Sequence, residues 1–427
     1  MPVKPTNYYT QVSNRYLNYV LVMLTLIYVF NFADRQILVI LQESIKKEFQ
    51  LSDTELGLLS GFVFAIFYVV LGIPIAQYAD RGNRRNIVAG SLGLWSIMTA
   101  ISGYAGNFIQ LLLARIGVGV GQSGESPAAH AMISDYFPQE KRSSALSIYS
   151  MGLYIGILIA FFMGGYLNHY YGWRTAFLVM GVPGIIFSLL FIATVKEPKR
   201  GASDVRESTT GKTYALRTAL KLLFSNPIFL YLALAVALHM FCIFALLNWA
   251  PSFLSRLHGM KTINIGISLG LIFGVSGAIG TYVRKILTDR LGKRDKRYHL
   301  RVPAYSILIS ILFTAGALFF QNNYLTLFCL GVSAFLQSMY LGPFIAVAHS
   351  LVPASMRALN SAIVLFILNL IGLGFGPLVV GIISDLLQPS MGIESLRWAL
   401  SVILIVNIAS AALFFAAARK IDINTAL

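Results

Sequence analysis

Asp80-Arg81-Gly82-Asn83-Arg84-Arg85 ends one long apolar segment of the chain, and a similar basic turn, Asp289-Arg290-Leu291-Gly292-Lys293-Arg294, ends another about two hundred residues later. Long apolar segments make up most of the remaining sequence. A short charged turn that recurs in matching surroundings indicates two repeated halves, and many transporters build their binding site between such halves. We therefore predict a duplicated membrane bundle.

The composition excludes a water-soluble globular protein. Of the 427 residues, 57% are hydrophobic and 12% are charged, which leaves too little polar surface to cover a soluble domain of this size. A membrane-spanning helix needs about 20 mostly apolar residues, and the chain contains about twelve such stretches. These stretches begin near Leu17, Leu56, Ile87, Phe108, Ala145, Ala176, Ile228, Ile265, Pro303, Tyr324, Asn360 and Trp398. We predict an all-α membrane protein with about twelve transmembrane helices in two six-helix halves.

The predicted halves are separated by the largest polar interruption in the chain. Residues 197–226 are rich in Lys, Arg, Ser and Thr, a composition typical of a linker between bundles. We therefore predict an N-terminal six-helix bundle over residues 1–196, a cytoplasmic linker over residues 197–226 and a C-terminal six-helix bundle over residues 227–427.

The formal net charge of +16 is distributed unevenly between the two sides of the predicted bundle. If residues 1–16 are cytoplasmic, most lysines and arginines fall in cytoplasmic loops, which is the positive-inside pattern with both termini cytoplasmic. The opposite side carries Lys46, Lys47, Arg174, Arg256, Lys261 and Arg397. The basic runs lack interleaved aromatic residues, so we expect no nucleic-acid binding. The short loops favour a bacterial cytoplasmic (inner) membrane, in which we expect a monomer surrounded by lipid.

Several short motifs resemble those of a known family. The turn at residues 80–85 and the run Arg115-Ile116-Gly117-Val118-Gly119 resemble the loop motif and the fourth-span Arg-x-x-x-Gly pattern of the major facilitator superfamily. Further features are similar to its Spinster-type branch: Asn83 in the basic turn, Asp34-Arg35, Gly57-Leu58-Leu59 and Ile133-Ser134-Asp135-Tyr136-Phe137. The resemblance implies a proton-linked carrier of amphipathic or lipid-like molecules, of lysolipid or sphingoid type, that works by alternating access.

The chain departs from the Spinster-type pattern at one position. Members of that branch usually carry a glutamate seven residues after the arginine of the fourth span, whereas this chain has Gln122 there and Glu125 three residues later. The two positions differ by about 60° around a helix, so the Glu125 carboxylate reaches the same cavity about one turn deeper. The hypothesis that Glu125 takes over the family's proton-coupling role rests on the resemblance, and this geometry is compatible with it.

Four ionisable residues lie within the predicted spans of the first half, namely Asp34, Arg35, Arg115 and Glu125. An ionisable group at mid-membrane costs roughly 2.5–3.5 kcal/mol on insertion scales, so such groups persist where they pair, face water or serve a transport pathway. Coupling requires a carboxylate that is bound alternately by an arginine and by a proton. We expect Asp34 to pair with Arg115, and Arg35 to meet Glu125 or an anionic substrate group. The alternative is a structural ion pair that fixes helix packing.

A polar stripe predicts the substrate cavity. Tyr28, Asn31 and Arg35 fall at positions i, i+3 and i+7 and therefore share one face of the first span. The second half contributes neutral or weakly basic groups instead of acids, which suggests coupling in one half and shape recognition in both. The predicted substrate-binding residues are Tyr28, Asn31, Arg35, Gln122, Tyr154, His239, Asn248, Gln337 and Asn369.

The two basic turns are candidates for a gate. Charged side chains and helix ends there would hold the cytoplasmic side closed in one state of the cycle. Simple anchoring of the topology is the alternative, since positive loops occur in any membrane protein. The predicted gating residues are Asp80, Arg81, Arg84, Arg85, Asp135, Arg142, Asp289, Arg290 and Arg294.

The pattern as a whole predicts a secondary active transporter rather than an enzyme. No Ser-His-Asp order, nucleotide-binding loop or metal-ligand spacing is visible, so we expect no catalysis, metal or cofactor. An organic-anion importer, in which Arg35 and Arg115 clamp a carboxylate or phosphate, is the first alternative. A multidrug exporter is the second. A lipid scramblase or receptor would use the same bundle without coupled transport.

Overall fold

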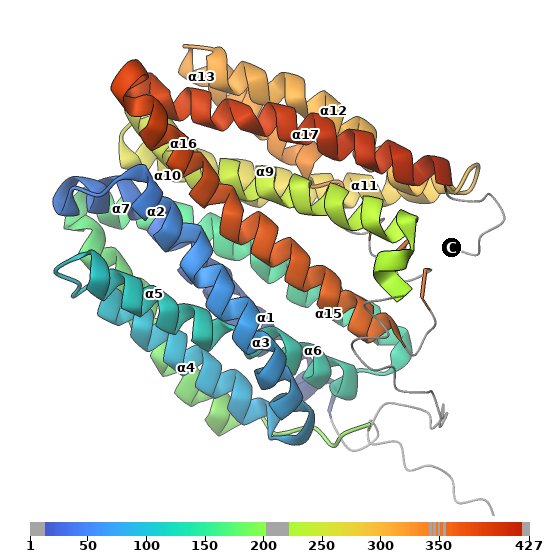
Figure 1. Ribbon diagram of the computed structural model, residues 1–427. Helices are drawn as coiled ribbons and strands as arrows, with labels where there is room; N and C mark the ends of the chain where they lie inside the picture. Colours follow the sequence, from blue (N-terminus) through green and yellow to red (C-terminus); the bar gives the residue numbers. More distant parts are fainter. Residues whose placement is uncertain are drawn as a thin grey trace, which may run out of the picture. The chain divides into compact units, whose positions relative to one another are not determined.

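The computed structural model describes residues 13–201, 222–340, 344, 347, 348, 351, 352 and 356–420. This described part is built from helices and contains no strand (Figure 1). The first helices are α1 (Asn14–Phe49), α2 (Asp53–Gly57), the π-helix η2 (Leu58–Phe62), α3 (Val63–Arg81), α4 (Arg84–Ser102), α5 (Phe108–Gln122), α6 (Glu125–Tyr136) and α7 (Gln139–Thr194). The later ones are α9 (Pro227–His258), α10 (Thr262–Leu269), η3 (Gly270–Ser276), α11 (Gly277–Gly292), α12 (Tyr298–Phe319), α13 (Asn323–Gln337), α15 (Arg357–Leu368), η5 (Asn369–Phe375), α16 (Gly376–Met391), the 3₁₀ turn η6 (Gly392–Glu394) and α17 (Ser395–Lys420).

These helices group into twelve successive passages. Within the described residues, seven helical stretches are long and apolar enough to cross a membrane. Two of them, Gln139–Thr194 and Ile363–Lys420, have 56 and 58 residues, which is more than twice the roughly 20 that one crossing needs. Each therefore holds two passages, and α4, the α5–α6 pair and α13 supply the rest. The predicted all-α class with about twelve helices is confirmed.

The longest helix, α7, is divided by a glycine. Gly172 has φ 81° and ψ 164°, a conformation that residues with a side chain rarely adopt. The chain reverses direction there, between the polar run that ends the first passage of α7 and the Trp173-Arg174 pair that opens the second. The second long stretch has a comparable break at Gly392, where φ is 55°.

The chain divides into two packing units. The first contains Met1–Ser44 and Ile66–Thr209, and the second contains Ile45–Ala65 and Thr210–Leu427. The end of α1, together with α2, η2 and the start of α3, thus packs with the second unit. The predicted bundle bounds, 1–196 and 227–427, stay a prediction, because residues 202–221 of the predicted linker lie outside the described residues.

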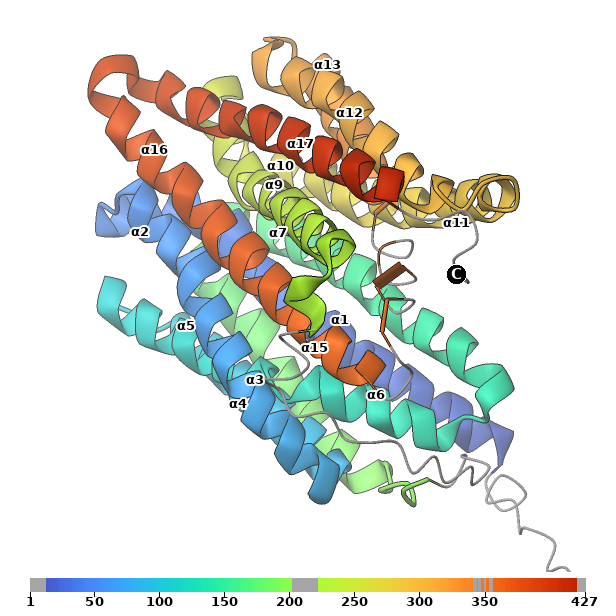
Figure 2. The same cartoon turned by 45° about the vertical axis from the view of Figure 1, so that its right-hand side comes forward.

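Both units contain closely packed helices. In the first unit a Cβ atom on Gly156 of α7 would lie 2.6 Å from the Val29 carbonyl oxygen of α1, so glycine permits the two helices to approach closely. In the second unit, α17 packs against α9 and α12 (Figure 2). Phe229, Ile307 and Phe414 belong to the apolar core that these three helices share.

Candidate functional site

Glu125 is the centre of a buried polar cluster in the first unit. It is the first residue of α6, where the helix restarts after Ser123 and Gly124, and its side chain is 0% exposed. The carboxylate accepts hydrogen bonds from Tyr149 Oη at 2.7 Å, Ser126 Oγ at 2.8 Å and Asn31 Nδ2 at 3.4 Å. The free N–H groups at the start of α6 also favour negative charge there.

Arg35 and Gln122 join α1 to α5 beside Glu125. Arg35 Nε donates to Gln122 Oε1 at 2.7 Å, and Gln122 Nε2 donates to the Asn31 carbonyl oxygen at 3.1 Å. The Arg35 guanidinium lies 4.6 Å from the ring centroid of Tyr68. The expected meeting of Arg35 with Glu125 or with an anionic substrate group stays a prediction. In the structure Arg35 is linked to Glu125 through Gln122 and Asn31.

The aromatic members of the predicted cavity lie in the same cluster. The Tyr28 ring stacks on the Tyr149 ring with centroids 4.4 Å apart, and Tyr149 is the residue that donates to Glu125. Tyr154 of α7 is half-buried and interacts electrostatically with Tyr28. The structure therefore brings Tyr28, Asn31, Arg35, Gln122 and Tyr154 together around Glu125.

Asp34 and Arg115 are neighbours. Arg115 Nη1 donates to the main-chain oxygen of Asp34 at 3.3 Å. The Asp34 carboxylate also faces Trp95 and Thr99 of α4, and the Arg115 charge acts on it. The predicted pairing of Asp34 with Arg115 therefore stays a prediction.

A second buried polar cluster lies within the second unit. His239 of α9 places Nδ1 3.1 Å from Asn407 Oδ1 of α17, and Nε2 2.9 Å from the Gln337 carbonyl oxygen of α13. Gln337 Nε2 donates to Ser333 Oγ at 2.6 Å, and Ser333 Oγ lies 2.7 Å from Thr314 Oγ1 of α12. The predicted residues His239 and Gln337 thus belong to one network that joins four helices.

The remaining predicted substrate residues of the second unit contact their own helices. Asn248 Nδ2 donates to the Phe244 carbonyl oxygen, and Asn369 Nδ2 donates to the Leu365 carbonyl oxygen, each at 2.8 Å. Asn248 is buried and Asn369 is partly exposed at the start of η5. Neither side chain joins the His239 network through a described hydrogen bond.

The first basic turn forms a charged clasp inside the first unit. Arg84, which is buried, pairs with the Asp135 carboxylate and with Glu197, whose Oε1 lies 2.8 Å from Arg84 Nε. The Arg85 main-chain N–H donates to Glu197 Oε2 at 2.8 Å. Arg142 Nη2 donates to the Ser134 carbonyl oxygen at 2.8 Å. These contacts fasten the start of α4 to the end of α6 and to the segment that follows α7.

The second basic turn differs from the first. Arg290 and Arg294 are exposed, and the ion pair beside them joins Asp295 and Arg301 at 3.5 Å. Arg81 of the first turn is also exposed. The side chains of Asp80 and Asp289 lie outside the described residues, so their predicted gating role stays a prediction.

Sequence reasoning missed two groups of charged residues. Glu197 was assigned to the linker, although it follows a span directly and completes the Arg84 clasp. Asp53, at the start of α2, forms ion pairs with Lys46 and Arg256. The sequence signal was the capping box Ser52-Asp53-Thr54-Glu55, which marks a helix start and so places Asp53 at the end of a span.

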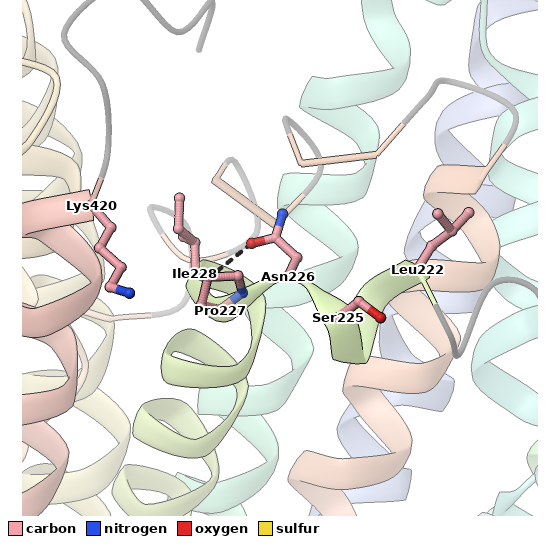
Figure 3. Close-up of a pocket in the computed structure, with 6 residues that line it drawn as sticks. All are labelled: Leu222, Ser225, Asn226, Pro227, Ile228 and Lys420. Atoms are coloured by element: carbon pink, nitrogen blue, oxygen red, sulfur yellow. Dashed lines mark hydrogen bonds between the residues drawn. The ribbon is translucent and has the colours of Figure 1, made fainter.

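The second unit also contains a surface hollow. It has a volume of about 620 Å³ and is lined by Leu222, residues 225–228 and Lys420, at the start of α9 and the end of α17 (Figure 3). Asn226 Oδ1 accepts from the Ile228 main-chain N–H at 2.9 Å, so the first turn of α9 is already capped. The predicted site residues do not line this hollow. No group of three or more metal-ligating side chains occurs within the part of the chain that the structure describes.

Comparisons with known proteins agree with the fold. The family model of the Major Facilitator Superfamily matches residues 24–304, which is more than half of the chain. An MFS-type efflux pump of Mycolicibacterium smegmatis is 33% identical over 380 residues, which cover 88% of this chain and 87% of that protein. Protein spinster homolog 1 of Xenopus tropicalis is 26% identical over 441 residues, which cover 98% of this chain and 84% of that protein.

A solved structure extends the likeness to the whole chain. The crystal structure of a bacterial homolog of the human lysosomal transporter Spinster, in an inward-facing and unoccupied conformation, is 31% identical with a TM-score of 0.86. The match covers 96% of this chain and 98% of that chain. This chain belongs to the major facilitator superfamily of transporters and, within it, to the Spinster-like branch.

Proposed function

We propose that this chain is a proton-coupled secondary active transporter that works by alternating access and moves an amphipathic or lipid-like small molecule of lysolipid or sphingoid type. Membership of the Spinster-like branch supports the transport class. The observation that carries the coupling step is the position of Glu125, a carboxylate buried in a membrane bundle and held by neutral hydrogen-bonding groups.

The partners of Glu125 suit both of its protonation states. The hydroxyls of Tyr149 and Ser126 donate to the ionised carboxylate, and either of them can accept the one hydrogen bond that the protonated acid donates. A proton can therefore be bound or released at this position without leaving a buried oxygen unpaired. Such a group changes charge while its surroundings keep their hydrogen bonds, which is what a reversible coupling residue requires.

Arg35 and Gln122 connect this carboxylate to the substrate. Both belong to the hydrogen-bonded set that shares Asn31 with Glu125. A substrate group that draws the Arg35 guanidinium away from Gln122 would disturb Asn31 and hence the hydrogen bonding of Glu125. We propose that substrate and proton affect each other through this path, with Asp34 and Arg115 as a second charged group on the same helix α1 and its neighbour α5.

The coupling step is tested in proteoliposomes with an imposed proton gradient. We expect Glu125→Gln to abolish gradient-driven accumulation, because the amide cannot release a proton, while substrate exchange at equal concentrations continues. Glu140→Gln is the matched control, since Glu140 is an exposed acid near the start of α7. Gradient-driven accumulation that is unchanged in Glu125→Gln would contradict the proposal.

An organic anion is the alternative substrate. The observation in its favour is that the Arg35 guanidinium lies over the rings of Phe32 and Tyr68 at 5.0 Å and 4.6 Å, an arrangement that presents a cation in an aromatic setting. Counterflow with a lysophospholipid, a sphingoid base and a dicarboxylic acid separates the candidates. A multidrug exporter would instead exchange structurally unrelated cations, and a scramblase would move lipid without saturable exchange or trans-acceleration.

We further propose a monomer in a bacterial cytoplasmic membrane with both termini cytoplasmic. The support is the one-sided distribution of lysine and arginine in the loops. Labelling of single cysteines placed beside Arg294 and Lys261 with an impermeant maleimide tests this orientation. We expect the position beside Lys261 to react in intact cells, and the position beside Arg294 to react after the membrane is opened.

A further inference from the structure

A group of buried polar side chains lies where α1 faces α4, within the first unit. Asp34 of α1 and Trp95 of α4 are 0% exposed, and Thr99 of α4 is 1% exposed. Trp95 and Thr99 face the Asp34 carboxylate closely enough to act on it. However, both carboxylate oxygens, the Trp95 Nε1 atom and the Thr99 Oγ1 atom lack a direct hydrogen bond to any described residue. Four polar atoms are therefore gathered at one place without direct partners.

Such a group needs an explanation, because burial removes the hydrogen bonds that water would otherwise make. Most buried polar atoms in folded proteins have a partner, either in the protein or in an ordered water. A single unpaired atom is a common local defect, whereas donors and an acceptor that face one another at slightly too great a distance are typical of a bridged contact. The side chains of Asp34, Trp95 and Thr99 have this second arrangement.

The second unit shows how a threonine at the same distance from a helix cap is satisfied by protein atoms alone. Thr99 precedes the N-cap residue Asn107 of α5 by eight positions, and Thr314 precedes the N-cap residue Asn322 of α13 by eight positions. The Thr314 Oγ1 atom lies 2.7 Å from Ser333 Oγ. Thr99 has no such direct partner among the described residues, and it faces a carboxylate instead.

The chemistry of the three side chains defines what can join them. An indole N–H only donates, an ionised carboxylate only accepts, and a threonine hydroxyl does both. The joining molecule must therefore accept from Trp95 and donate to Asp34. A metal cation cannot accept a hydrogen bond, and the Arg115 charge that acts on Asp34 also disfavours it. The Asp34 carboxylate disfavours an anion. A water molecule has both functions, and buried waters typically make about three hydrogen bonds.

We propose that the Asp34 carboxylate, Trp95 Nε1 and Thr99 Oγ1 hold an ordered water molecule between α1 and α4. This water donates to the carboxylate when Asp34 is ionised and accepts from it when Asp34 is protonated, so Asp34 has a partner in both forms. Trp95 and Thr99 are then positioning residues that act on Asp34 through the water. The site lies in the first unit and does not depend on the proposed proton coupling, since a bundle that transports without protons would hold the same water.

Nuclear magnetic resonance of the tryptophan side chains tests the water site without a transport assay. The full-length protein in nanodiscs, with isotope-labelled tryptophan, gives one indole N–H signal for each of its four tryptophans, and Trp→Phe variants assign them. We expect a nuclear Overhauser cross-peak between the Trp95 indole proton and water. Trp249 is the matched control, because it is 1% exposed and its Nε1 donates directly to the Pro377 carbonyl oxygen at 2.9 Å. Its signal should show no such cross-peak.

Two substitutions of one residue separate a bound water from other sources of the signal. Thr99→Val keeps the shape of the side chain and removes the hydroxyl, so a cross-peak that persists cannot arise from exchange through that hydroxyl. Thr99→Ile adds one carbon atom, which should take the place of the water and abolish the cross-peak. An unchanged Trp249 signal verifies that each variant is folded.

Three results would overturn the proposal. Absence of the Trp95 cross-peak in the parent would show that the indole bonds directly to Asp34. Loss of the cross-peak in Thr99→Val would trace it to the hydroxyl, and its persistence in folded Thr99→Ile would place the water elsewhere. Thr314→Val, which removes the corresponding hydroxyl from the second unit, should leave the Trp95 cross-peak as it is in the parent.

Discussion

The two buried polar clusters of this transporter differ in charge. The cluster around Glu125 in the first unit contains a carboxylate on α6 and a guanidinium on α1, whereas the cluster around His239 in the second unit consists of an imidazole, amides and hydroxyls. Both are almost completely buried. The difference teaches that burial of polar groups is common to the two units, while the ability to change charge is concentrated in one.

The polar groups of the cluster around His239, which we call the neutral cluster, hydrogen-bond mainly to one another. His239 has an oxygen atom near each ring nitrogen, and Asn407 Nδ2 has no hydrogen-bond partner among the described residues. Exchange of the oxygen and nitrogen of the Asn407 amide gives His239 Nδ1 a donor, and Nε2–H then donates to Gln337. A neutral imidazole then has a partner at each ring nitrogen. The second unit is thereby built for fixed hydrogen bonding.

The largest loss of stability is expected where a substitution leaves a buried charge of the first unit without its opposite charge. Arg115→Gln leaves the buried Asp34 carboxylate without the positive charge that acts on it, so we expect a loss of about 3 kcal/mol in the free energy of unfolding. The double variant Asp34→Asn, Arg115→Gln should recover most of this loss. Denaturation in detergent measures both. Equal destabilisation of the single and double variants would contradict the view that Arg115 stabilises the fold by balancing the Asp34 charge.

A smaller effect is expected at the first basic turn. Arg84→Gln breaks the clasp with Asp135 and Glu197, of which Glu197 is partly exposed, so we expect a loss of about 2 kcal/mol in the free energy of unfolding. Limited proteolysis after Glu197 should become faster, because Glu197 and Pro198 both bind Arg84. An unchanged cleavage rate would mean that the clasp does not hold this segment.

Substitution in the neutral cluster should lower the stability of the protein without changing proton coupling. His239→Ala leaves the Gln337 carbonyl oxygen and the Asn407 amide without their partner, which costs about 1.5 kcal/mol. The pH dependence of transport should stay that of the parent, since no group that changes charge is removed from the Glu125 cluster. A transport assay from pH 5.5 to pH 8 checks this. A shifted pH profile would show that the second unit takes part in proton coupling. It would contradict the proposal that coupling is confined to the first unit.

The sequence predicts these clusters better than it predicts their contacts. Long apolar runs require helices, and a charge inside such a run must be sheltered, so Asp34, Arg35, Arg115 and Glu125 were found from their positions alone. Their partners depend on the rotation of each helix, which residue spacing does not determine. The hydrogen bond from the Tyr149 hydroxyl to Glu125, for example, was not predicted. The π-helical segments η2 and η5 change which side of the helix the following residues face. No residue pattern predicted these segments.

Ion pairs between residues far apart in the chain could not be predicted from the sequence either. Arg84 and Glu197 are 113 positions apart, and Asp53 and Arg256 are 203 apart. Charges at the ends of spans look alike in a sequence, because positive loops and structural ion pairs have the same composition. Separating them requires the neighbours that only the folded chain brings together.

The smallest effect is expected at the second basic turn, and it sharpens the comparison between the units. Arg294 is exposed, and an exposed arginine contributes little to stability because water and salt screen its charge. We expect Arg294→Gln to leave the unfolding midpoint within experimental error of the parent, in contrast to Arg84→Gln in the first basic turn. A reduced transport rate with an unchanged midpoint would show that this turn acts in another state of the cycle. A reduced midpoint would show instead that the two basic turns are equivalent clasps, and the contrast between the units would then be limited to their interiors.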